Sequence, residues 1–189
     1  MFRLFAALAL NTGARVGELI ALRNEDVQLE RRSIHIWRTF EQETQIIVER
    51  TKSKADRWLG INDALYDALV EHKRSTHRSK PEDLLITLED GEPVNEWKIR
   101  RRHRRTCARA GVKTIRVHDL RHTYASHYIM NGGSLADLQG LLGHSTSMMT
   151  LKYTHLAPGH LKSKSNVVSF GAVTPPCEAT VVTLADRRK

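Results

Sequence analysis

The sequence contains few of the residues that build disulfide-linked or metal-dependent proteins. Its 189 residues include two cysteines, Cys107 and Cys177, which stand alone, so neither a disulfide framework nor a zinc site is predicted and a reducing, cytoplasmic setting is expected. No apolar run approaches the ~20 residues that cross a membrane, and the start is unlike a secretory signal. The sequence also lacks a P-loop and any Asp and Glu cluster suited to two metal ions. We therefore expect no cofactor, no metal, no membrane and no small-molecule substrate.

What the chain does have is positive charge. It contains 30 Lys and Arg against 21 Asp and Glu, which gives a net charge of +9 and a pI near 9.9. Hydrophobic residues make up 40% of the chain, enough at this length for one domain with a core. An excess of this size favours a polyanionic partner, and a basic surface that serves only solubility is the alternative.

The periodicity of apolar residues predicts a mainly α fold with a small antiparallel three-stranded sheet. Asn62 and Ser134 stand where they can cap helices, and Gly13, Gly111 and Gly143 where helices can end. One domain is expected over residues 1–165, followed by a flexible or docking tail over 166–189, where the composition changes. Helices are predicted over 2–10, 14–22, 62–73, 94–110, 118–130, 135–142 and from about 147 through Tyr153, and strands over 33–39, 45–50 and 57–61.

The predicted helix over 94–110 carries a dense run of arginines. Because they fall on several faces of the helix, part of the run must face solvent, where a nucleic-acid backbone could bind it. Solvation alone is the alternative. The candidate DNA-binding residues are Arg100, Arg101, Arg104 and Arg105, together with Lys54 on a predicted hairpin turn.

Several scattered residues have the chemistry needed to displace an oxygen at a phosphodiester. Arginine forks match the non-bridging oxygens, a tyrosine hydroxyl can attack in line, and a lysine or histidine can protonate the leaving oxygen. Each also has a plain structural interpretation: Arg15 as a surface ion pair with Glu18, Tyr153 as a core aromatic, His144 as a helix-end cap. The candidates are Arg15, Lys52, His118, Arg121, His144 and Tyr153.

The order and spacing of these residues resemble the tyrosine recombinase (phage integrase) family, over about residues 2–156. In that family the signature runs Arg, Lys, His-x-x-Arg, His or Trp, and Tyr. The matching segments are Thr12-Gly13-Ala14-Arg15-Val16-Gly17-Glu18-Leu19, Thr51-Lys52-Ser53-Lys54, His118-Asp119-Leu120-Arg121-His122, Leu142-Gly143-His144 and Tyr153-Thr154-His155.

The resemblance implies a role for each matching residue. Tyr153 would be the nucleophile, forming a 3′-phosphotyrosyl link, and Arg15 and Arg121 would hold the non-bridging oxygens. Lys52 would protonate the leaving 5′ oxygen. His118 would serve as acid and base toward Tyr153, and His144 would hydrogen-bond the phosphate. Glu18 would hold Arg15, and His122, next to Arg121, is interpreted as a neighbouring structural histidine.

The resemblance also implies double-stranded DNA as partner, a tetramer on paired DNA sites, and site-specific recombination without ATP or metal. In two places the sequence departs from the family. Arg57 is followed by Trp58-Leu59-Gly60-Ile61 instead of a Val-Pro-Leu-like run, and the family's N-terminal DNA-binding domain has no counterpart, so a truncated catalytic domain is expected. A DNA-binding remnant without catalysis, and relaxation of DNA like a type IB topoisomerase, are the alternative functions.

Overall fold

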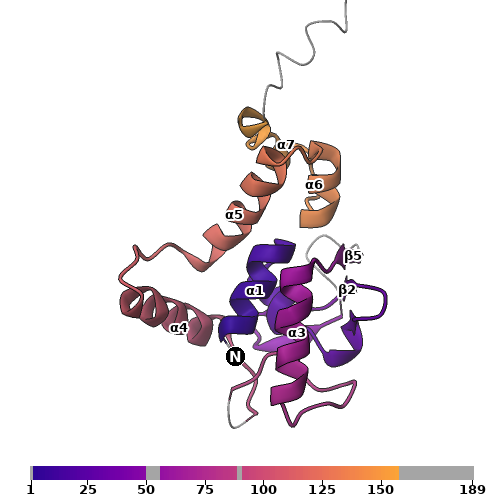
Figure 1. The fold of residues 1–189 in the computed structure, drawn as a ribbon, viewed down its shortest axis with the longest axis vertical. Coiled ribbons are helices and arrows are strands. Elements are labelled where there is room, and N and C mark those ends of the chain that lie inside the picture. The colour runs from indigo at the N-terminus through magenta and orange to yellow at the C-terminus, as the bar shows by residue number, and fades with distance from the viewer. Residues whose placement is uncertain (1, 50–55, 89–90, 158–189) are drawn as a thin grey trace, which may run out of the picture. The chain divides into compact units, whose positions relative to one another are not determined.

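The computed structural model describes residues 2–49, 56–88 and 91–157 (Figure 1). Lys52, Lys54, the predicted boundary at residue 165 and the tail lie outside the described residues. The helices are α1 (Phe2–Thr12), α2 (Val16–Ile20), α3 (Asp63–Ser75), α4 (Glu96–Arg109), α5 (Val117–Met130), α6 (Leu135–Leu142) and α7 (Met148–Leu151). The strands are β1 (Val27–Gln28), β2 (Ser33–Ile36), β3 (Thr39–Glu41), β4 (Ile46–Val48) and β5 (Arg57–Gly60), and 3-10 turns cover Asn24–Asp26 and Thr154–Leu156.

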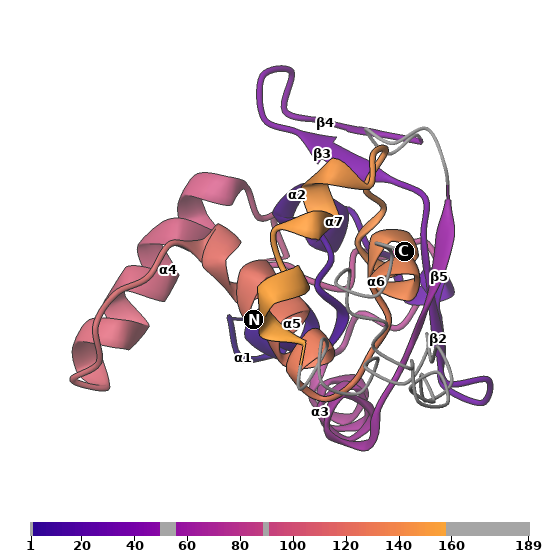
Figure 2. The same cartoon turned by 90° about the horizontal axis from the view of Figure 1, so that it is seen from above.

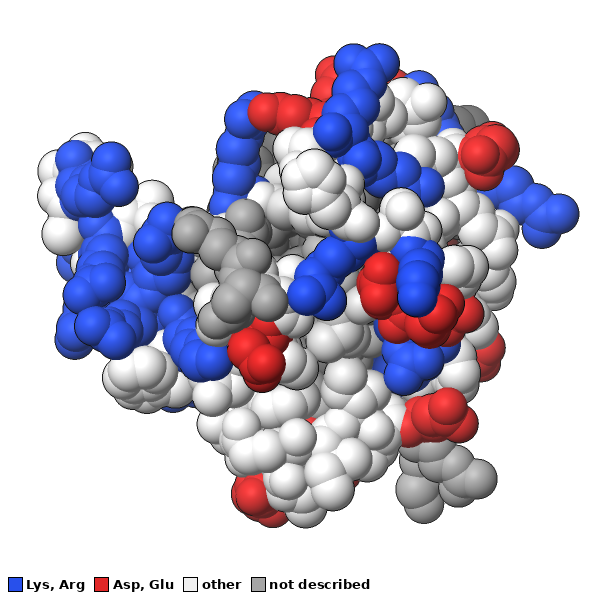
Figure 3. Space-filling model, turned by 90° about the horizontal axis from the view of Figure 1, so that it is seen from below, with Lys and Arg blue, Asp and Glu red and all other residues white. Residues whose placement is uncertain are grey.

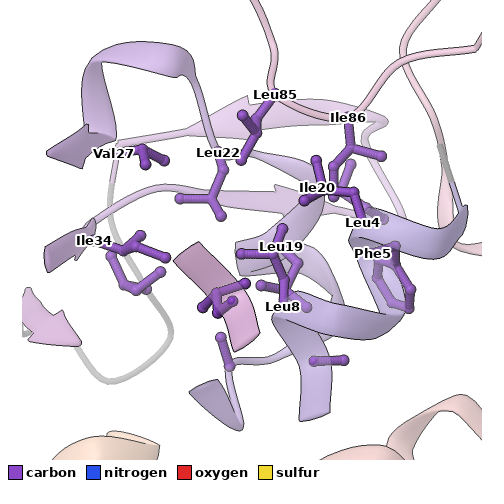
Figure 4. Packing of buried hydrophobic residues seen from close by; sticks show 14 of the residues in the cluster. Leu4, Phe5, Leu8, Leu19, Ile20, Leu22, Val27, Ile34, Leu85 and Ile86 are labelled. Carbon is purple, nitrogen blue, oxygen red and sulfur yellow. The ribbon is translucent and has the colours of Figure 1, made fainter. Parts of the chain in front are cut away.

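The main core forms around α1. Leu4, Phe5 and Leu8 recur at helical spacing, so one face of α1 is apolar and becomes buried. Figure 4 shows these side chains packed against Leu19 and Ile20 of α2. The helix also contacts α3 and α5, so the N-terminal segment is enclosed by elements from the rest of the described chain.

The predicted three-stranded antiparallel sheet is confirmed, but one of its strands differs from the expected set. The observed order is β1-β2-β5, with Ile34 of β2 between Val27 and Leu59. The expected strand over 45–50 forms β4, which pairs with β3 in a separate two-stranded sheet. The strand β1 is only two residues long, too short to produce a recognisable alternation in the sequence.

The two sheets separate at Trp37 and Arg38, whose side chains bind a residue of another segment. The expected strand over 33–39 breaks here, because both side chains bind Asp26: Trp37 Nε1 donates to Oδ1 at 2.8 Å and Arg38 Nη1 to Oδ2 at 2.9 Å. Arg38 also pairs with Glu25. A buried ion pair therefore interrupts the hydrogen-bond ladder between the strands. The periodicity of apolar residues could not predict this interruption.

The predicted caps at Asn62 and Ser134 are present, and Asn95, which was not predicted, caps a third helix. Asn62 accepts from the Leu65 amide at 2.9 Å, Asn95 from the Lys98 amide at 2.9 Å, and Ser134 from the Asp137 amide at 3.0 Å. These three contacts fix the starts of α3, α4 and α6, respectively.

The elements α5, α6 and the end of the described chain share a second buried cluster, formed by Ala125, Ile129, Leu138, Leu142 and Tyr153. The expectation of a last helix through Tyr153 is wrong in extent, because α7 ends at Leu151 and Tyr153 lies just before the 3-10 turn that follows. Figure 2 shows α6 near β5, and the two elements are in contact.

Among the described helices, none is long and apolar enough to cross a membrane.

Candidate active site

Arg15 and Glu18 are brought together by the tight turn between α1 and α2. Gly13 adopts the left-handed conformation, with φ of +64°, and Arg15 precedes the first residue of α2. Glu18 then folds back: its Oε2 accepts from the Arg15 amide at 2.8 Å and its Oε1 from Arg15 Nη1 at 2.9 Å. The expected contact between Glu18 and Arg15 is present.

The Glu18 carboxylate also binds a second arginine, Arg57 of β5. Arg57 Nη1 and Nη2 donate to the two carboxylate oxygens of Glu18 at 3.1 and 2.7 Å, a forked contact across the fold. The Glu18 side chain is 1% exposed. Burial on its own raises the pKa of Glu18, but the hydrogen bond and charge of Arg57, followed by those of Arg15, outweigh it and leave the pKa below its ordinary value.

Three guanidinium groups converge on the C-terminal end of α6. Arg57 Nε donates to the Leu141 carbonyl at 2.8 Å, Arg121 Nη2 to the Leu142 carbonyl at 2.7 Å, and Arg15 Nη2 to the Gly143 carbonyl at 2.8 Å. These carbonyls have no partner within the helix and carry the negative end of its dipole. The helix end therefore assembles three cations drawn from α5, β5 and the start of α2. We call Arg15, Arg57 and Arg121 the arginine cluster.

Gly143 is required at this place for two reasons. It ends α6 with φ of +61°, which favours glycine, and a Cβ atom there would lie 2.9 Å from Arg57 Nη1. The Gly of the Leu142-Gly143-His144 motif thus gives Arg57 room to reach the helix end. Arg121 is fixed further by its Nη1, which donates to the Gly13 carbonyl at 2.8 Å.

The arginine cluster carries more positive than negative charge. Glu18 supplies one carboxylate against three guanidinium groups in this described part of the chain. Burial, and next the charge of Arg15, lower the pKa of Arg121 to about 10, which still leaves it charged at neutral pH. The cluster is therefore suited to bind an anion such as a phosphate.

His144 lies beside the cluster as a neutral imidazole. Burial, and next the charges of Arg121 and Arg15, lower its pKa to about 4. Its Nδ1 lies 2.8 Å from Thr150 Oγ1, and in the Nε2–H tautomer the threonine hydroxyl donates to Nδ1. In that tautomer the Nε2–H of His144 can donate a hydrogen bond to a ligand, and the ring carries no charge.

Tyr153 is buried and hydrogen-bonded to His122. Its side chain belongs to the cluster between α5 and α6 and is 5% exposed. The distance from its hydroxyl to His122 Nδ1 is 2.5 Å. Burial raises the pKa of Tyr153, while the nearby charge of Arg121 opposes that effect. The phenol is therefore protonated at neutral pH and lies within the electrostatic influence of the arginine cluster.

His118 occupies the more exposed end of the same face of α5. Its ring contacts that of His122 edge to face, with 4.8 Å between the centroids. Desolvation, and next the charges of Arg121 and Lys152, lower the pKa of His118. A cleft of about 430 Å³ extends from Arg15 and His118 toward Arg100 of α4.

The arginines of α4 lie on the surface. Arg100, Arg101, Arg104 and Arg105 are all exposed. Figure 3 shows Lys and Arg gathered over this helix, at the left of the view. A second hollow, of about 570 Å³, is lined by Arg100, Arg101, Arg104 and His118. The two hollows share Arg100 and His118, so a basic surface connects α4 with the candidate active site.

The structure thus brings together Arg15, Glu18, Arg121, His122, His144 and Tyr153, with His118 at the edge. Sequence reasoning missed two points: that Arg57 belongs to the cluster, and that His122 contacts the candidate nucleophile. A signal for the second was present, because His118 and His122 are i, i+4 neighbours on one helix. No group of three or more His, Cys, Asp or Glu suited to a metal ion was found within the described ranges.

A family model described as the phage integrase family matches residues 2–160. Among curated proteins, the chain is 30% identical over 175 residues to the integrase of Haemophilus phage HP1, an alignment that covers 93% of this chain and 42% of that protein. It is 31% identical over 151 residues to the tyrosine recombinase XerC of Corynebacterium efficiens, covering 79% of this chain and 44% of that protein. The chain therefore spans less than half the length of these relatives.

Two solved structures show the same fold. The catalytic domain of bacteriophage HP1 integrase superposes with a TM-score of 0.57 at 29% identity, covering 93% of this chain and 84% of that domain. The Tn1549 transposon integrase in complex with transposon right end DNA gives a TM-score of 0.75 at 22% identity, covering 87% of this chain and 57% of that one. The predicted fold class is confirmed.

Proposed function

The chain belongs to the phage integrase family, and from this premise we propose that it cleaves and rejoins double-stranded DNA as a site-specific recombinase, with Tyr153 as the nucleophile. The observation that carries the proposal is the convergence of the arginine cluster on α6, next to the neutral His144 and the buried Tyr153. Remote segments of the chain supply these groups, which have the chemistry needed to bind and attack one phosphodiester.

In the first step the Tyr153 oxygen attacks phosphorus, and the bond from phosphorus to the 5′ oxygen breaks. The product is a 3′-phosphotyrosyl link and a free 5′-hydroxyl. Negative charge grows on the non-bridging oxygens as the transition state is reached, so the N–H groups of Arg15 and Arg121 bind it more strongly than the ground state. His144 donates from Nε2 to the same phosphate.

Two protons must move in this step. The phenol proton of Tyr153 goes to an imidazole of α5, and the leaving 5′ oxygen takes a proton from Lys52. Attack by a 5′-hydroxyl from another strand reverses both transfers and releases Tyr153. Because the covalent link keeps the energy of the broken ester, rejoining needs neither ATP nor metal.

The DNA partner is proposed from the charge of the surface and from the relatives. The exposed arginines of α4 can contact the phosphate backbone, which positions a duplex without reading its sequence. Relatives in this family have been solved with DNA, including the Tn1549 integrase and XerH bound to its difH substrate. We propose that this chain likewise acts on duplex DNA, as a homotetramer on paired sites.

A covalent capture experiment tests the proposal. The protein is incubated with a library of nicked duplexes of randomised core sequence, where loss of a short 5′-hydroxyl fragment traps the intermediate. Protein-linked DNA is then isolated under denaturing conditions and sequenced. The wild type is expected to give an adduct and Tyr153→Phe none, whereas Tyr128→Phe, on α5, serves as the matched control and should behave as wild type.

The possible results separate the functions. An adduct as abundant in Tyr153→Phe as in the wild type would refute the assigned nucleophile. Retention of DNA by the wild type in a shift assay with no adduct from any duplex would leave a DNA-binding role without catalysis. Relaxation of supercoiled plasmid by monomer, with no sequence preference among captured duplexes, would favour a topoisomerase-like activity.

A further inference from the structure

The Tyr153 hydroxyl has a well-defined partner in the second histidine of the His118-Asp119-Leu120-Arg121-His122 segment. His122 Nδ1 lies 2.5 Å from the hydroxyl oxygen, and the two ring centroids are 6.1 Å apart. Because His122 follows Arg121 directly on α5, one turn of the helix directs the guanidinium toward α6 and the imidazole toward the phenol. The same element thus holds both a phosphate-binding residue and a partner for the nucleophile.

The protonation states of the two groups suit a proton transfer from the phenol to the imidazole. Desolvation, and next the charges of Lys152 and His118, lower the pKa of His122, so the imidazole is neutral at neutral pH. Tyr153, with its raised pKa, keeps its proton. In the Nε2–H tautomer of this neutral imidazole, Nδ1 is the acceptor and the Tyr153 hydroxyl donates to it. In that arrangement the proton to be removed lies between the phenol oxygen and the base.

His118 has a different environment. Its described contact is with the ring of His122, not with the phenol. Its side chain also lines the two hollows that lead to Arg100. It is therefore placed to hold the His122 ring and to face a DNA backbone, rather than to remove the Tyr153 proton.

We infer that His122 is the general base of the strand-cleavage step and that His118 positions it, an assignment that rests on the proposed function. As the Tyr153 oxygen bonds to phosphorus, its O–H bond breaks and the proton moves to Nδ1 of His122. The electron pair of the broken phosphorus–oxygen bond goes to the leaving 5′ oxygen. In rejoining, the protonated His122 returns its proton to the phenol oxygen as the phosphotyrosyl bond breaks.

Several groups face the imidazole and set its charge. They come from α5 and its cap, and from the segment after α7: Arg116, His118, Asp119, Lys152 and Tyr153. Asp119 favours the charged imidazole, and the cations oppose it. Asp119 is itself bound by Arg116 at 2.9 Å, which weakens its effect on His122. The net result is a base that is neutral when the phenol is ready to attack.

The test measures the single-turnover rate of adduct formation against pH, with a captured nicked duplex as substrate. In the wild type the rate should rise with pH and then level off, because only neutral His122 can accept the proton. The pKa of this rise should lie below the ordinary histidine value of about 6.5. His122→Gln can accept a hydrogen bond but not a proton, so its rate should fall roughly 10²–10⁴-fold and lose the acid limb. Added imidazole should partly restore the rate of His122→Ala.

His118→Gln is the matched control, expected to keep the acid limb of the profile. If His122→Gln keeps the wild-type rate and acid limb while His118→Gln loses them, the assignment to His122 is overturned. A structural measurement separates this outcome from failure of the proposed function. In ¹⁵N NMR spectra of the wild type at neutral pH, the Nδ1 of His122 should be unprotonated and hydrogen-bonded, and its chemical shift should change in Tyr153→Phe. A protonated Nδ1 would contradict the inference, whether or not an adduct forms on any duplex.

Discussion

Replacing Glu18 with Gln tests how the arginine cluster is held together. The substitution keeps the size of the side chain but removes the carboxylate that binds Arg15 at 2.9 Å and Arg57 at 2.7 Å. Two guanidinium groups then remain close to each other, and to Arg121, without an opposing charge. The substitution should therefore destabilise the fold as well as the site.

The expected size of the effect follows from burial. Removing one partner of a buried ion pair costs about 3–5 kcal/mol, because the other charge is left without compensation. Arg57 is 9% exposed and Arg15 25% exposed, so Arg15 keeps part of its hydration. We therefore expect the lower end of the range, about 3 kcal/mol, or a fall in Tm of roughly 6–12 °C for a domain of this size.

The pH dependence gives a sharper signature. Because the pKa of Glu18 is lowered in the folded state, its stabilising contribution is present in full above the unfolded pKa of about 4.3 and is lost as the pH falls through the folded value. The difference in unfolding free energy between wild type and Glu18→Gln should thus be largest at neutral pH and shrink below about pH 4.3.

Urea titrations followed by far-UV circular dichroism, at pH 7 and at pH 3, measure both effects. Glu96→Gln serves as the matched control, since its partner Arg100 is 67% exposed and the pair should contribute less than about 0.5 kcal/mol. A loss below 1 kcal/mol for Glu18→Gln at pH 7, or a loss that is the same at pH 3, would refute the reasoning from the buried carboxylate.

Two further substitutions test the surroundings of the site. Arg57→Lys keeps the charge but loses the fork that binds Glu18 and the Leu141 carbonyl, so urea titration should show a free energy of unfolding lower by about 2 kcal/mol; an unchanged midpoint would show that the charge alone suffices. Arg104→Gln should weaken DNA binding and reduce the slope of log affinity against log salt by about 1, measured by fluorescence anisotropy, whereas Arg74→Gln on α3 should leave the slope unchanged.

The local features of the fold were open to prediction from the sequence. Asn62, Ser134 and Gly143 mark helix ends by chemistry that acts within a single turn, and each does so in the structure. The contact of Glu18 with Arg15 is equally local. Such features depend on neighbours in the chain, which periodicity and capping rules describe.

The features that were missed depend on contacts between distant residues. Arg57 joins Glu18 across 39 positions, and Arg15 reaches Gly143 across 128. Neither contact can be predicted from the spacing of apolar residues. The break at Trp37 and Arg38 belongs to the same class, because it arises from Asp26 in another segment. The meeting of His122 with Tyr153 also required knowing how α5 lies against the end of the described chain.

The dependence of the arginine cluster on the end of α6 has a consequence for the timing of synthesis. A ribosome makes Arg15 and Arg57 long before it reaches Leu141, Leu142 and Gly143, whose carbonyls bring the cations together. Until that helix has emerged and folded, a nascent polypeptide has the arginines but no assembled phosphate-binding group. An unfinished chain, or one released before α6, would carry the positive charge of these arginines without the arrangement that the proposed function requires.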